Sequence, residues 1–85
     1  MAYKKIKKIK VIYRKLGREN AFGLSLEDES LIEIDSELNP RKTLFVTVHE
    51  AAHLALPELS ESKILRLEKI IGKVLWQEDY RKVIQ

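Results

Sequence analysis

The segment between Asn39-Pro40 and Pro57 constrains the fold of this chain more than any other segment. Asn is a favoured helix N-cap and Pro is favoured at the first helical position, so we expect a helix to begin here. Pro57 disfavours helical geometry for the residue before it, so the helix should end near Leu56. Between these limits apolar residues recur at the spacing of an amphipathic helix: Leu44, Phe45, Val48, Ala51, Ala52 and Ala55.

This expected helix contains both histidines of the chain, in the pattern His49-Glu50-Ala51-Ala52-His53. Side chains four residues apart share one face of a helix, so both imidazoles can reach a single metal ion. Glu50 lies on the adjacent face, where its carboxylate can act as general base on a zinc-bound water. The alternative is two ordinary histidines at the edge of a helix. By chance the pattern arises in about one chain of this composition in 370, so we favour a zinc site.

A catalytic zinc ion commonly takes three protein ligands and leaves a fourth position for water. The chain has no cysteine and no third histidine, so the third ligand has to be a carboxylate. Glu58, Glu61 and Glu68 are the downstream candidates. We favour Glu61, which falls in the first turn of the next expected helix, although an acid there also interacts favourably with the helix dipole. Glu68 is the runner-up, and its alternative role is an ion pair with a neighbouring Lys or Arg.

Local patterns predict the remaining elements. Alternating side chains predict strands near residues 9–14, 21–26 and 31–35, with polar connections between them. Ser60 is a plausible N-cap for a second helix, and its apolar stripe is Ile64, Leu67, Ile71, Val74 and Leu75. The expected fold is therefore a single α+β domain over residues 1–85, with a three-stranded antiparallel meander followed by two helices.

The charge is distributed unevenly. Residues 1–18 carry eight Lys/Arg and no acid, whereas residues 19–85 carry eight Lys/Arg and thirteen Asp/Glu. A basic segment can bind nucleic acid or an acidic partner, but we favour a solvated edge strand, with residues 1–8 as a flexible basic terminus. No apolar run is long enough for a membrane span or a signal peptide, so we expect a cytoplasmic protein without membrane contact.

Taken together, the expected strands, the His49–His53 motif and the following Leu59-Ser60-Glu61 resemble the minimal zincin-type metallopeptidases. The chain is similar to the SprT-like and ImmA/IrrE-like groups, and most of all to short bacteriophage-encoded proteins with the H-E-x-x-H motif. The resemblance spans about residues 9–76. It implies zinc ligation by two histidines and a downstream glutamate, with the glutamate of the motif as general base.

For this chain, the resemblance implies that His49, His53 and Glu61 bind zinc. It also implies that Glu50 is the general base in the hydrolysis of a peptide or protein substrate. The gap from His53 to Glu61 is short for this family. Tyr13 and Tyr80 are candidates for stabilising an oxyanion, and the sequence does not decide between them. Two other functions stay open at this point. One is a zinc-stabilised binding or regulatory module without catalysis, and the other is a nucleic-acid adaptor that uses residues 1–18.

Overall fold

The computed structural model describes residues 8–83, and its elements follow the expected order. The strands are β1 (Lys10–Arg14), β2 (Gly23–Leu26) and β3 (Leu31–Asp35), and the helices are α1 (Pro40–Ala55) and α2 (Glu61–Gln77). Single 3₁₀ turns, Gly17–Glu19 and Glu27–Glu29, connect the strands. The α+β class is thereby confirmed. Residues 1–7 of the predicted basic segment lie outside the described residues.

The sheet is mixed, so the prediction of a purely antiparallel meander is wrong. Its order is β1-β3-β2, with β1 parallel and β2 antiparallel to β3. The last strand lies in the centre because it carries the buried residues Ile32 and Ile34, which need neighbours on both sides. Every residue of β1 is exposed, as suits an edge. The connection from β1 to β2 is long, so these two strands do not pair with each other. β3 lies between them and pairs with both.

An ion pair joins β1 to the central strand. The guanidinium of Arg14 donates to the carboxylate of Glu33 and also pairs with Glu19. The hydrogen bond from Arg14 holds the pKa of the Glu33 carboxyl below its ordinary value. One of the basic residues of the N-terminal segment therefore has a structural role at the edge of the sheet.

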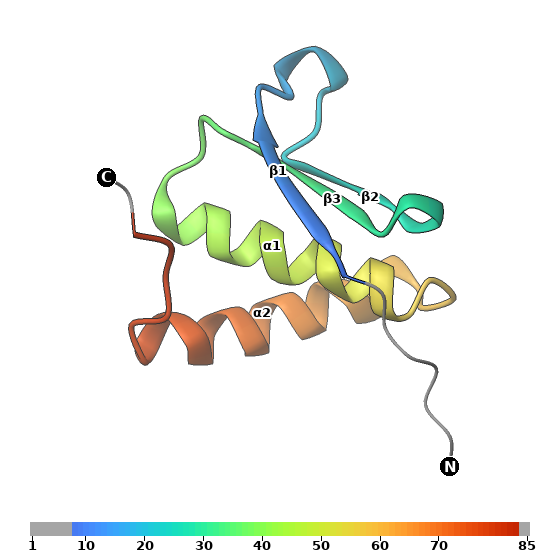
Figure 1. Ribbon diagram of the computed structural model, residues 1–85. Helices are drawn as coiled ribbons and strands as arrows, with labels where there is room; N and C mark the ends of the chain where they lie inside the picture. Colours follow the sequence, from blue (N-terminus) through green and yellow to red (C-terminus); the bar gives the residue numbers. More distant parts are fainter. Residues whose placement is uncertain (1–7, 84–85) are drawn as a thin grey trace.

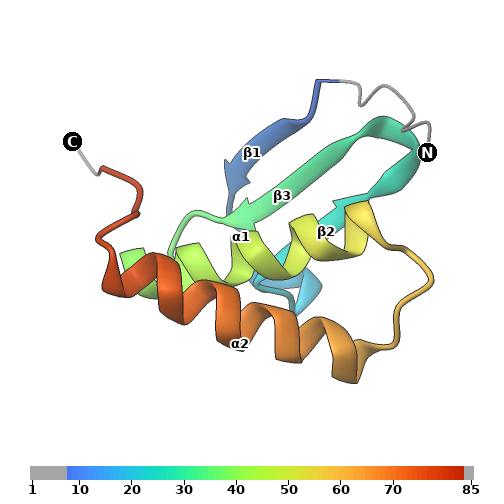
Figure 2. The same cartoon turned by 90° about the horizontal axis from the view of Figure 1, so that it is seen from below.

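Helix α1 lies between the sheet and α2, which gives the molecule three layers (Figures 1 and 2). The core is small: Ile32, Ile34 and Val46 pack together, with Leu38 and Leu54 partly buried against them. The expected helix limits are confirmed, since Asn39 Oδ1 accepts a hydrogen bond from the backbone N–H of Lys42 and α1 ends at Ala55. No helix within residues 8–83 is long and apolar enough to cross a bilayer.

The two helices approach closely at Gly72. A Cβ atom built on this glycine would lie 2.8 Å from ring atoms of Phe45 on α1. The glycine therefore lets the helices pack at short range, and it brings the functional side chains of α2 within reach of α1.

We expect Gly72→Ala to lower the free energy of unfolding. Alanine favours a helix by about 1 kcal/mol, but overpacking against Phe45 costs about 1–3 kcal/mol. Gly17→Ala is the matched control, because nothing lies within 4 Å of a Cβ atom at that position. Urea denaturation of both variants measures the difference. A Gly72→Ala protein more stable than the parent would contradict the close approach of α1 and α2.

Candidate metal centre

The first part of the site is the pair of histidines on α1. His49 and His53 lie one turn apart on the same face, with ring centroids 4.9 Å apart and ring planes at 64°. Both side chains are largely buried between α1 and α2. This is the arrangement that the four-residue spacing predicts.

Glu61 completes a group of three possible ligands. It is the first residue of α2, and the short turn after Ala55 brings it back to the end of α1. One carboxylate oxygen lies 2.9 Å from Nε2 of His49 and the other lies 3.0 Å from Nε2 of His53. Glu61 is 58% exposed at its side chain, so it can adjust to an ion. Glu58, in the turn, is not part of this group.

The donor atoms fit a metal ion. One ligand atom from each of His49, His53 and Glu61 lies within 4.8 Å of the other two. Two imidazole nitrogens and one carboxylate oxygen make a three-ligand set that leaves a position open for water or substrate. The structure therefore brings together a group that could hold a metal ion.

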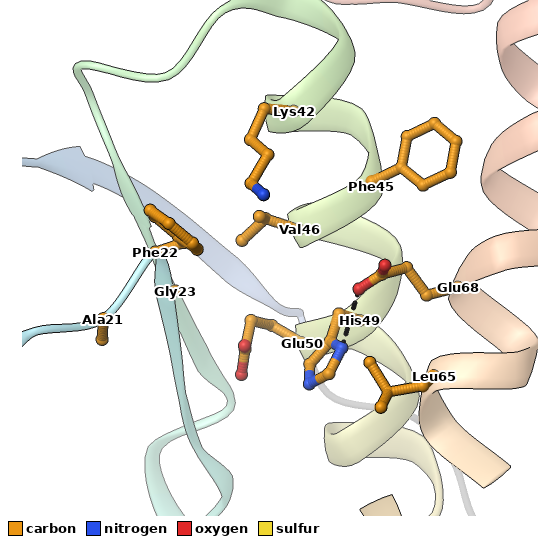
Figure 3. Close-up of a pocket in the computed structure, with 10 residues that line it drawn as sticks. All are labelled: Ala21, Phe22, Gly23, Lys42, Phe45, Val46, His49, Glu50, Leu65 and Glu68. Carbon is orange, nitrogen blue, oxygen red and sulfur yellow. Dashed lines mark hydrogen bonds and ion pairs between the residues drawn. The ribbon is translucent and has the colours of Figure 1, made fainter. Parts of the chain in front are cut away.

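Glu68 contacts His49, but it belongs neither to the group of possible ligands nor to an ion pair with Lys or Arg among the described residues. Its carboxylate lies 2.8 Å from Nδ1 of His49 (Figure 3), whereas Glu61 contacts Nε2 of the same ring. A carboxylate accepts a hydrogen bond from Nδ1–H and so favours the tautomer in which Nε2 keeps its lone pair, which is the tautomer that binds a metal. Glu68 thus orients His49.

Glu50 lies on the sheet side of α1 and is only 8% exposed. The hydroxyl of Ser25 on β2 donates to it, at 2.6 Å from Oε1 and 2.9 Å from the backbone carbonyl oxygen. Sequence reasoning did not identify Ser25. The available signal was the alternation of small residues in β2, since Gly23 and Ser25 share one face of the strand.

Two clefts open beside α1, both with walls from β2 and the first also with a wall from α2, and Glu50 lines both of them. One has a volume of about 360 Å³ and includes His49 and Glu68, while the other has a volume of about 400 Å³ and includes His53. Apolar side chains form much of the first cleft, as Figure 3 shows: Phe22, Phe45, Val46 and Leu65. Tyr13 and Tyr80 line neither cleft.

No protein-family model matches the chain, and neither a curated protein nor a solved structure matches it.

We expect Gly23→Ala to displace Glu50 more than it displaces His49, His53 and Glu61. A Cβ atom at this position would lie 2.6 Å from a methyl carbon of Val46 and 2.8 Å from Cγ of Glu50. Overpacking of this kind costs about 1–3 kcal/mol of stability. Urea denaturation measures the loss, and a crystal structure of the variant shows whether the Glu50 carboxylate has left Ser25. A variant with unchanged stability and an unmoved Glu50 would contradict the close contact between β2 and α1.

Proposed function

We propose that this chain is a zinc-dependent metallopeptidase of the minimal zincin type. The observation that carries the proposal is the placement of one carboxylate, Glu61, across the Nε2 atoms of both motif histidines. Two imidazoles and a carboxylate are the ligand set of many catalytic zinc sites, and the chain offers no thiolate. Glu50, beside this group and outside it, supports a catalytic role over a purely structural one.

Zinc bound by His49, His53 and Glu61 would acidify a water molecule and polarise the scissile carbonyl. Glu50 takes the proton from the attacking water and passes it to the leaving amine. Ser25 holds Oε1 of this carboxylate, so Oε2 is the oxygen that receives the proton. Glu68 fixes the ring of His49 through Nδ1.

The sheet offers a way to bind an extended peptide. β2 is an edge strand, and no other strand within residues 8–83 pairs with its outer edge. A peptide that adds to this edge forms main-chain hydrogen bonds and runs along the clefts beside Glu50. Phe22 and Leu65, which are both exposed, would contact its apolar side chains.

The ligand set predicts about one zinc ion per purified chain, and the two downstream glutamates should differ in a zinc titration. Glu61→Gln should weaken zinc binding by orders of magnitude, because it removes a charged ligand. Glu68→Gln should weaken it only about tenfold, the usual scale for a group that orients a ligand. Competition with a fluorescent chelator measures both affinities. Equal losses, or a larger loss for Glu68→Gln, would move the site along α2.

Glu50→Gln separates catalysis from metal binding. The variant should keep the fold and zinc, since glutamine has the same shape and its carbonyl oxygen still accepts from Ser25. Cleavage of a mixed peptide library should fall by about 10²-fold or more, the scale of a lost general base. Glu58→Gln, at an exposed position in the turn, is the control and should cleave normally.

Two results would count against this assignment. Loss of zinc from Glu50→Gln would make Glu50 a ligand in place of a base. A parent protein that binds zinc tightly but cleaves no member of the library would contradict peptidase activity, and would favour a zinc-stabilised binding module.

A further inference from the structure

The face of α2 that points away from the site is strongly apolar. Ile70, Ile71 and Val74 are 55%, 42% and 53% exposed, and together with Leu67 they form a continuous stripe at helical spacing. Single exposed aliphatic residues are ordinary on a surface, whereas several that adjoin one another are a candidate interaction surface.

A groove runs along this stripe at its N-terminal end. It has a volume of about 340 Å³, and its walls come from α2 and from Leu56 and Leu59 in the turn between the helices. Leu67 and Ile70 line it together with Lys63 and Arg66. The apolar stripe therefore has exposed side chains near Val74 and the groove near Leu67, about two helical turns before Val74.

The stripe has opposite charges at its two ends. Lys63 lies one turn before Leu67, and Glu78 lies one turn after Val74. Among residues 8–83 neither Lys63 nor Glu78 forms an ion pair within the chain. From the N-terminal to the C-terminal end, the stripe therefore runs from the basic Lys63 through apolar residues to the acidic Glu78.

We propose that this face binds the same face of a second copy, with the two α2 helices antiparallel. In that orientation Lys63 of each copy meets Glu78 of the other, while Leu67 meets Val74 and Ile70 meets Ile71. Val74 of each copy then reaches the groove of the other. A parallel pair would place Lys63 against Lys63, which opposes association. The face is self-complementary, as a two-fold interface requires.

The dimer leaves the candidate metal centre accessible. Glu61, Leu65 and Glu68 follow one another at three or four residues on the face of α2 toward α1. Lys63, two residues after Glu61, lies about 200° around the helix from it. The interface and the clefts therefore use different faces of the same helix, and the proposal does not depend on peptidase activity.

Sedimentation equilibrium of the full chain with zinc tests the proposal. The parent protein should form a reversible dimer at a concentration on the order of 100 µM, as suits a modest interface. Ile70→Glu should make it monomeric by burying a charge in the centre. Lys63→Glu and Glu78→Lys should each raise the dissociation constant by roughly tenfold at low salt, because each places like charges together at both ends. Circular dichroism confirms that the variants are folded.

The two charge variants also provide a rescue. In an equimolar mixture, the Lys63→Glu chain and the Glu78→Lys chain should form a heterodimer as tight as the parent homodimer, since both end contacts regain opposite charges. The double variant should dimerise normally for the same reason. A parent chain that stays monomeric to ~1 mM would overturn the proposal and leave the groove to a different protein. A dimer insensitive to Ile70→Glu, or a mixture without rescue, would also overturn it.

Discussion

The turn between α1 and α2 is the constraint on which the site depends. Pro57 ends α1, and α2 begins four residues later at Glu61, so the helices must run back along one another. Gly72 then permits close packing five residues before the C-terminal end of α2. With both ends held together, Glu61 and Glu68, two helical turns apart, lie on either side of the His49 ring.

A second close approach, between the sheet and α1, defines the surroundings of Glu50. β2 turns Gly23 and Ser25 toward the helix and its leucines away from it. Small residues on the inner face allow a carboxylate between the layers, and the serine hydroxyl satisfies one of its oxygens. The same strand is an edge of the sheet, so the Glu50 carboxylate lies close to the free backbone edge.

The sequence predicted the helices well because their limits depend on local signals: Asn39-Pro40, Pro57 and the apolar spacing. It also predicted the convergence of His49, His53 and Glu61. It failed for strand order, because the choice of central strand depends on burial of Ile32 and Ile34 by distant parts of the chain. Ser25 was missed for a related reason: the alternation of small residues in β2 shows which face Ser25 shares with Gly23, but its partner Glu50 lies 25 positions away and is set by the packing of β2 against α1.

The charges around the histidines give a physical reason for a cation at this place. Glu61 and Glu68 contact the imidazoles and Glu50 lines the clefts beside them, and in the part of the chain that the structure describes none of the three pairs with Lys or Arg. The cations that do form ion pairs are engaged elsewhere, as Arg14 is with Glu33 at the edge of the sheet. Negative side chains gathered around one site are stabilised by a positive charge placed among them. A divalent ion held by His49, His53 and Glu61 would supply positive charge here, and its binding would then add to the stability of the helical pair.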